Sequence, residues 1–298
     1  MINKDNSIQT KISISCVREG EKTLLKNSAF DIPYKVVHYG AKSLTKHLEI
    51  MMMCYSPGVM DGDDLSVEVS CKAGAEMKLF TQSFNKLHPM KSGAKQTFIA
   101  HIEKGALFQF LPCPTIPFKD SIFKAENTIH VAESGHLIWG DIISGGRIHS
   151  GESFLFTKFH NITKVFLAEK ILLVDNQLLV PKNQPLDNIV FFEKFTHQAT
   201  LIIVSSYAVA LKAELDEILV AKVTDMQYGF TQCNKNTIML RALGFSGDAL
   251  HQWLEKIGDL CFSFIQFKIQ EEATVSETAV VKSKQKPKPK QQKPKLRA

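Results

Sequence analysis

The chain has 298 residues, of which 44% are hydrophobic, and a formal net charge of +6 at pH 7. Residues 282–297 hold eight of its 36 basic residues and no acidic residue, so residues 1–281 carry 28 basic against 30 acidic residues. This near-neutral body argues against a nucleic-acid-binding surface. The length and apolar content suffice to bury one large core or two small ones.

The cysteines and the apolar runs are typical of a reduced, soluble protein. The six cysteines include no CxxC pair, and the polar start has no signal peptide, so we expect free thiols and a cytoplasmic location. The longest nearly apolar run, residues 201–211, is about half as long as a bilayer span and contains two serines. We therefore expect no membrane segment.

The amino-terminal part of the chain predicts β structure. Residues 11–17 alternate polar and apolar side chains, residues 19–21 supply a turn, and residues 23–25 resume the alternation, which predicts a β-hairpin. Pro33 makes residues 30–39 an irregular or edge segment. Residues 48–55 form a nearly continuous apolar run, which predicts a buried strand.

A β unit of about 30 residues occurs three times between residues 65 and 141. In each copy an alternating strand enters a turn with a central glycine and leaves as a second alternating strand. The three glycines are Gly74, Gly105 and Gly135. A repeat of this length predicts strands stacked in a solenoid or in layered sheets rather than a closed barrel. The predicted fold class is therefore mainly all-β, with a few short helices, notably near the carboxyl terminus.

Irregular stretches follow the copies of the repeat, at residues 81–88, 112–118 and 140–152, and an acidic stretch at residues 56–64 leads into the first copy. If the copies stack in register, all four stretches meet at one edge of the sheet. Irregular segments on a rigid scaffold are where binding sites are usually built. The carboxylates that these stretches bring to the edge are Asp61, Asp63, Asp64, Asp141 and Glu152.

Two interpretations of this acidic edge stay open. Asp and Gly are ordinary turn residues, so residues 56–64 taken alone favour a solvated turn. Converging carboxylates could instead hold a divalent ion weakly and exchange it quickly. The stretch is no EF-hand, because Lys72 stands where the bidentate Glu is required. The sequence also has no P-loop, HExxH or GxSxG motif, so hydrolysis is a weak hypothesis.

The carboxyl-terminal part predicts helices and a tail. Residues 201–211 suit a buried strand and residues 211–223 a short helix. After residue 246, apolar residues recur at helical spacing, and this stripe either packs on the protein's own sheet or binds a partner in a groove. Its members include Leu250, Trp253, Leu254 and Ile257. We expect residues 1–270 to form one β-rich domain and residues 271–298 a disordered lysine- and proline-rich tail.

The four irregular stretches resemble those of the urease accessory proteins called UreD, or UreH in some bacteria. The similarity covers roughly residues 11–265, and the sequence is most similar to the UreH variant. The order and spacing of the motifs are more specific than any one motif. The residues that carry the resemblance include Ser56, Pro57, Gly58, Gly62 and Asp63, then Thr81, Gln82 and Lys86, then Pro117, then Gly146, Arg147, Gly151 and Glu152.

The resemblance implies a stack of β-strands and a non-enzymatic role in urease maturation. Family members bind the accessory protein UreF directly and the GTPase UreG through UreF, and the assembly inserts nickel into apo-urease. A homodimer of the whole assembly is also left open. The resemblance implies no tightly bound cofactor, only transient nickel(II), and no nucleic-acid or membrane partner.

The family is expected to contain an internal tunnel as the nickel route. By motif position, Asp63, Asp141 and Glu152 would lie on that route. Two other functions stay open. One is a scaffold that bridges UreF and urease without carrying nickel, and the more remote one is a metal-dependent hydrolase.

Overall fold

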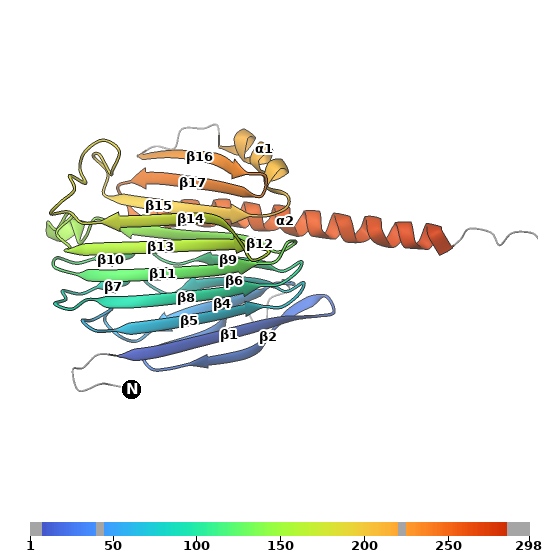
Figure 1. Ribbon diagram of the computed structural model, residues 1–298, viewed down its shortest axis with the longest axis horizontal. Coiled ribbons are helices and arrows are strands. Elements are labelled where there is room, and N and C mark those ends of the chain that lie inside the picture. The colour runs from blue at the N-terminus through green and yellow to red at the C-terminus, as the bar shows by residue number, and fades with distance from the viewer. Residues whose placement is uncertain (1–7, 40–44, 220–224, 285–298) are drawn as a thin grey trace, which may run out of the picture.

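Two β-sheets lie face to face and form the body of the molecule (Figure 1). The computed structural model describes residues 8–39, 45–219 and 225–284, with side chains to residue 274. The first sheet has seven strands in the order β14 (Lys170–Leu179), β13 (Lys158–Leu167), β11 (Ile122–Val131), β8 (Ala94–Ile102), β5 (Asp64–Cys71), β1 (Gln9–Glu19) and β2 (Lys22–Phe30).

The second sheet has ten strands, two of which branch from its main path. The main path runs in the order β16 (Met226–Asn234), β17 (Thr237–Gly244), β15 (His197–Val204), β12 (His136–Ser144), β9 (Leu107–Leu111), β6 (Glu76–Thr81), β4 (Leu48–Cys54) and β3 (Tyr34–Tyr39). The short branching strands are β7 (Asn85–Leu87) and β10 (Thr115–Pro117).

The repeat predicted from the glycine spacing is confirmed. The first strands of the three copies, β5, β8 and β11, pair in parallel in the first sheet. The second strands, β6, β9 and β12, pair in parallel in the second sheet. The turns between them stack as well, since Gly74 N donates to Lys104 O at 2.9 Å and Gly105 N donates to Ser134 O at 3.0 Å. The fold is therefore mainly all-β and layered, as expected.

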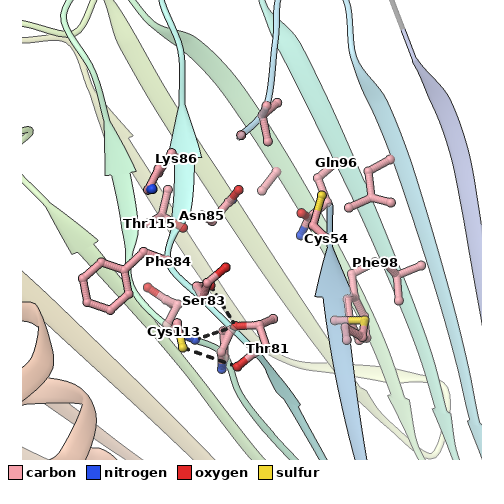
Figure 2. Close-up of a pocket in the computed structure, with 18 of the residues that line it drawn as sticks. Cys54, Thr81, Ser83, Phe84, Asn85, Lys86, Gln96, Phe98, Cys113 and Thr115 are labelled. Carbon is pink, nitrogen blue, oxygen red and sulfur yellow. Dashed lines mark hydrogen bonds between the residues drawn. The ribbon is translucent and has the colours of Figure 1, made fainter. Parts of the chain in front are cut away.

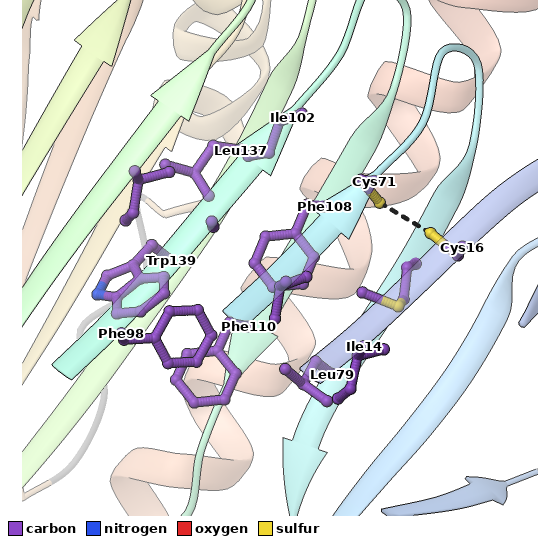
Figure 3. Close-up of a cluster of buried hydrophobic side chains, with 14 of the residues drawn as sticks. Ile14, Cys16, Cys71, Leu79, Phe98, Ile102, Phe108, Phe110, Leu137 and Trp139 are labelled. Atoms are coloured by element: carbon purple, nitrogen blue, oxygen red, sulfur yellow. Dashed lines mark hydrogen bonds between the residues drawn. The ribbon is translucent and has the colours of Figure 1, made fainter. Parts of the chain in front are cut away.

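The core fills the space between the two sheets. Phe98 of β8 packs against Phe110 of β9 and Trp139 of β12, with ring centroids 4.9 and 5.0 Å apart (Figure 3). Because successive side chains of a strand point to opposite faces, every second residue of each strand is directed into this layer. Burying each such aromatic side chain contributes about 1.5–3 kcal/mol. The apolar core therefore holds the two sheets together.

The predicted hairpin and helix occur with shifted boundaries. Strands β1 and β2 pair antiparallel as the hairpin. The expected helix starts earlier than predicted, as α1 (Ala208–Ile218), because strand β15 already ends at Val204. Ser205 then begins the turn into α1, with its Oγ accepting the Tyr207 N–H at 3.0 Å. Residues 220–223 of the predicted helix lie outside the described residues.

The long helix α2 (Gly247–Lys284) lies against the outer face of the second sheet, and this corrects the partner-binding interpretation of its apolar stripe (Figure 1). Leu250, Leu254 and Ile257 are at most 3% exposed and belong to the apolar cluster beneath the helix. The Trp253 ring packs on Tyr228 of β16, with centroids 4.9 Å apart. All four side chains therefore pack against other residues of this chain.

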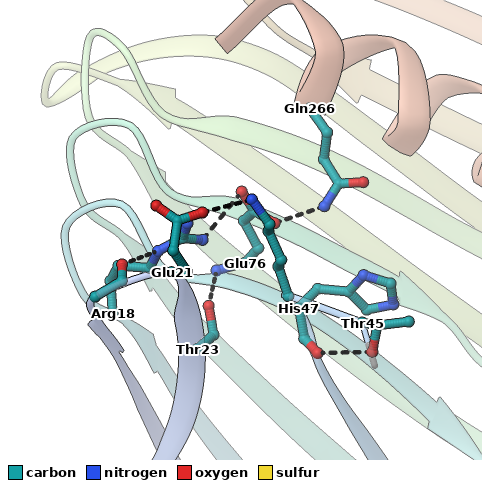
Figure 4. A network of polar contacts seen from close by, with 9 residues as sticks. Arg18, Glu21, Thr23, Thr45, His47, Glu76 and Gln266 are labelled. Carbon is teal, nitrogen blue, oxygen red and sulfur yellow. Dashed lines mark hydrogen bonds and ion pairs between the residues drawn. The ribbon is translucent and has the colours of Figure 1, made fainter. Parts of the chain in front are cut away.

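Polar contacts also fix α2 on the sheet. Lys78 of β6 pairs with Asp259 at 2.7 Å. Gln266 Nε2 donates to Glu76 Oε2 at 2.5 Å, and Arg18 of the hairpin approaches Glu76 Oε1 at 3.4 Å (Figure 4). Glu76 is buried, so these partners offset the free energy cost of removing its charge from water.

Helix α2 continues past residue 270, the expected end of the folded domain, and projects beyond the sheets (Figure 1). The part of the predicted tail from residue 285 onward lies outside the described residues, so the domain boundary stays a prediction. No helix in the described part of the chain is long and apolar enough to span a membrane.

Candidate functional site

The four irregular stretches are numbered here in chain order: residues 56–64, 81–88, 112–118 and 140–152. They meet at one end of the molecule, as the repeat predicts. Val59 of the first stretch donates to Lys86 O at 2.8 Å and accepts from His88 N at 2.9 Å. Strand β7 of the second stretch pairs in parallel with β10 of the third, and Thr115 of β10 is a register partner of Ile143 in β12. The stretches therefore form a continuous stack, called the motif edge below.

Gly58 is required by the close approach of the first two stretches. A Cβ atom at this position would lie 2.5 Å from the carbonyl oxygen of Lys86 and 2.8 Å from the His88 ring. Ser56 fixes the same turn, because its Oγ donates to Gly58 O at 2.6 Å. Pro57 stands exposed between them.

Other motif residues also serve the stack. Thr81 Oγ1 accepts from Cys113 N at 2.9 Å, which ties the second stretch to the third. Gln82 N donates to Met52 O at 3.0 Å, and Pro117 is the register partner of Leu87. Gly62 N donates to Gly93 O at 3.0 Å. These contacts give these motif residues a structural role, because they hold the stretches together.

Arg147 and Glu152 form a surface ion pair within the fourth stretch, next to Phe118 of the third. Arg147 Nε donates to Glu152 Oε2 at 2.9 Å, and a second, shorter bond joins the two side chains. The guanidinium also lies 4.5 Å from the centroid of the Phe118 ring. The hydrogen bond from Arg147 keeps the pKa of Glu152 below the ordinary value. Both oxygens of Glu152 are thus engaged. Gly146 directly before Arg147 and Gly151 directly before Glu152 both have positive φ, which glycine adopts most readily.

Asp63 is also engaged by backbone groups. Its Oδ1 accepts from Ile8 N at 3.0 Å and its Oδ2 accepts from Met60 N at 2.8 Å. The carboxylate therefore ties the start of β1 to the acidic loop. The placement of Asp63 and Glu152 on a nickel route stays a prediction, and the contacts give both residues a structural task.

Replacing Asp63 by Ala should lower the free energy of unfolding by about 1–3 kcal/mol, because two partly buried N–H groups lose their acceptors. Urea unfolding of the variant measures this loss. Asp64→Ala is the matched control, since the Asp64 carboxylate forms an ion pair with the exposed Lys95 at 2.9 Å and such pairs contribute about 0–1 kcal/mol. Equal stability of the two variants would contradict the structural task of Asp63.

A cavity of about 230 Å³ opens at the motif edge and reaches between the sheets (Figure 2). Its outer part is lined by the first three stretches, and its inner part by both sheets. Polar side chains dominate the outer part, among them Ser83, Asn85, Lys86 and Thr115 (Figure 2). The inner part contains Gln96, Asn127, Asn161 and Asp141, beside the ring of Trp139.

Two rows of polar residues continue from the cavity between the sheets and end at the exposed Arg241. In the first sheet, Asn127, Thr163 and Asp175 are successive register partners on β11, β13 and β14. Asn127 Nδ2 donates to Thr163 Oγ1 at 3.0 Å. In the second sheet, Asp141, Thr200 and Arg241 are successive register partners on β12, β15 and β17.

The two rows join at their far ends. Arg241 of the second sheet forms an ion pair with Asp175 of the first sheet. Nearby, Gln177 Nε2 donates to Gln198 Oε1 at 2.7 Å, again between the sheets. These residues were not among those predicted from the sequence, although polar residues at inward positions of alternating strands are a usable signal.

Asp141 is the unusual member of this polar interior. It lies two residues after Trp139 in β12 and therefore on the same face of the strand, so its side chain points between the sheets and lines the cavity. In the part of the chain that the structure describes, no group donates a hydrogen bond to it. Burial and, to a smaller extent, the Asp175 charge raise its pKa to about 7, against the opposing effect of the Arg241 charge. Asp141 is thus an unpaired carboxyl group that titrates near neutral pH.

The structure keeps the three predicted route residues apart. Asp141 lines the cavity, Asp63 lines a small neighbouring pocket, and Glu152 lies in the surface loop. Among the described residues, no group of three or more His, Cys, Asp or Glu side chains is placed to hold a metal ion. The carboxylates do not form the joint ligand set that the hydrolase hypothesis requires.

The chain is similar to known urease accessory proteins. A family model described as UreD urease accessory protein matches residues 9–274. The urease accessory protein UreD of Acetivibrio thermocellus is 34% identical over 245 residues, which cover 81% of this chain and 92% of that protein. The protein of the same name from Flavobacterium johnsoniae is 31% identical over 259 residues, covering 86% and 91%. Urease accessory protein UreH of Helicobacter pylori strain P12 is 30% identical over 187 residues, covering 62% and 69%.

Proposed function

The chain belongs to the UreD family of urease accessory proteins, and on this premise we propose that it conducts nickel(II) toward apo-urease during urease maturation. It would act without catalysing a reaction. Its proposed partners are UreF by direct contact, UreG through UreF, and apo-urease. Nickel is the cargo of this protein and no resident cofactor is proposed.

The observation that carries the proposal is the unpaired carboxyl group of Asp141 in a cavity that has both polar and apolar lining. Apolar side chains normally fill the space between two packed sheets, whereas the partly exposed side chain of Asp141 faces the cavity. The cavity and the two polar rows therefore suit a passage for a polar cargo better than a structural core. A carboxylate at its inner wall selects for a cation.

The donor set suits transfer rather than storage. Carboxylate, amide and hydroxyl oxygens bind nickel less firmly than a closed set of thiolates and imidazoles would. A conducting site must bind an ion well enough to admit it and weakly enough to release it. At the far end of the rows, Arg241 occupies the Asp175 carboxylate, so a departing cation would have to displace this guanidinium.

A scaffold without nickel transport is the second candidate. The contacts of Asp63 and Glu152 favour it, because hydrogen bonds within the motif edge engage both oxygens of each carboxylate. In this alternative the motif edge is an interface and the cavity carries no ion.

Reconstitution of urease activation distinguishes the two candidates. Apo-urease, UreF, UreG, bicarbonate and limiting nickel are combined with or without the full chain, and urease activity is followed together with co-purification of the complex. We expect activation to require the chain and expect cavity variants to assemble normally but activate poorly. Activation that tracks complex formation in every cavity variant would support the scaffold and contradict transport.

A further inference from the structure

Two buried cysteines face each other across the first sheet. Cys16 of β1 and Cys71 of β5 are register partners on neighbouring parallel strands, and their sulfur atoms lie 3.2 Å apart (Figure 3). Neither side chain has any exposed surface. The chain's other cysteines, at positions 54, 113, 233 and 261, make no such contact. The pair is therefore a distinct chemical feature of the core.

The geometry of the pair suits a covalent bond. Neighbouring strands lie about 4.8 Å apart, within the roughly 4.4–6.8 Å between Cα atoms that disulfides bridge. The sulfur atoms need to approach by only about 1 Å to reach the ~2.05 Å bond length. Strand β1 has a register irregularity between Ser15 and Cys16 where it pairs with β2, so its backbone can adjust at this point.

We propose that Cys16 and Cys71 are a redox-sensitive dithiol that oxidises to an intrachain disulfide and cross-links β1 to β5. With a small disulfide such as oxidised glutathione, one thiolate attacks the reagent and forms a mixed disulfide, releasing one glutathione thiol. The second cysteine then displaces the other glutathione as a thiol. The protein loses two protons and two electrons, and the glutathione disulfide is reduced to two thiols.

The cross-link would lie on the strand pair that carries the acidic loop. At the opposite end of this pair, Ile8 N donates to Asp63 Oδ1 at 3.0 Å and Asp64 N donates to Ile8 O at 2.9 Å. A disulfide at Cys16 and Cys71 would therefore prevent β1 from separating at one end while Asp63 holds the other. The redox state would set how firmly the motif edge is anchored.

The reaction should be slow in the closed protein. The hydrogen bond with Cys16 and burial both raise the pKa of Cys71, so little of the reactive thiolate is present. Oxidation then proceeds through local opening of the amino-terminal strand. This protects the dithiol from brief exposure to oxidant.

The test uses the full-length protein incubated with excess oxidised glutathione under native conditions, then denatured and alkylated. Peptide mass mapping should find the Cys16 and Cys71 peptides joined, with the loss of two hydrogen atoms. The thermal unfolding midpoint should rise by about 5–10 °C and return to its starting value with dithiothreitol, because the cross-link restricts the unfolded chain.

Single serine variants provide the controls. Cys16→Ser and Cys71→Ser should each abolish the joined peptides, and Cys261→Ser should not, since Cys261 is buried without a sulfur neighbour. Wild-type protein is also oxidised at a urea concentration below the unfolding transition. This part of the test does not depend on whether the variants fold. The proposal is overturned if Cys16 and Cys71 stay alkylatable there while cysteines 54, 113 and 233 are glutathionylated. The proposal is also overturned if the two cysteines resist alkylation without the loss of two hydrogens and a chelator restores their alkylation. That result would indicate a bound metal ion.

Discussion

Asp141→Asn should lower the rate of nickel-dependent urease activation by about tenfold or more while the accessory complex still assembles. Asparagine keeps the size of the side chain and its position on β12, but it removes the unpaired carboxylate from the cavity wall. A tenfold loss corresponds to about 1.4 kcal/mol of lost interaction with the passing cation. The measurement is the initial rate of activation at limiting nickel in the reconstituted system.

Asp64→Asn is the matched control for Asp141→Asn. It makes the same chemical change on a carboxylate that forms a surface ion pair with Lys95. We expect this variant to activate urease at the wild-type rate. Full activation with Asp141→Asn would contradict the transport proposal, and loss of co-purification with UreF would assign the residue to assembly instead.

Asp141→Asn should also change how the free energy of unfolding depends on pH. The folded pKa of Asp141, about 7, lies above the roughly 3.9 of an unfolded aspartate. Between these values the folded state binds more protons than the unfolded state, so stability from protonated Asp141 is complete below about pH 4 and is lost as pH rises through about 7.

Asparagine removes this titration from the folded state. The variant should therefore gain stability relative to the wild type as the pH rises from about 5 to 8, by at most about 3 kcal/mol. Urea unfolding at several pH values checks this trend. A constant difference across the range would contradict a buried, titrating Asp141.

The layered fold was predictable because its signals are local. Each copy of the repeat has its own glycine turn and alternating strands, and Gly74 and Gly105 stack as the spacing predicted. Because the copies stack in register, the irregular stretches necessarily lie at one edge of the sheets. The polar rows had a weaker local signal, since Asn127 and Asn161 occupy inward positions of otherwise apolar strands.

The partners of the predicted site residues were not predictable, because they lie far away in sequence. Asp63 accepts from Ile8, 55 residues away, and Arg241 meets Asp175 across 66 residues. Motif position identified Asp63 and Glu152, but it could not distinguish an open carboxylate from one engaged by backbone N–H groups or an arginine. Only Asp141 combines a predicted position with an unpaired side chain.

The apolar stripe of α2 illustrates another gap. Helical periodicity shows that a face is apolar but does not reveal which surface covers it. In the structure, strand β9 is buried along its whole length, because the core covers one face and α2 the other. Docking of α2 therefore completes the second sheet.

Leu254→Ala should consequently destabilise the fold by about 2–5 kcal/mol. Leu254 is 2% exposed in the cluster under α2, so truncation removes buried apolar surface and leaves a cavity. Leu260→Ala makes the same change on the same helix at a side chain that is 46% exposed, and it should change stability by no more than about 0.5 kcal/mol. Urea unfolding of both variants measures the contrast. A stable Leu254→Ala protein that no longer co-purified with its partners would instead show that this face of α2 binds a partner and that its packing on the sheet is not required for folding.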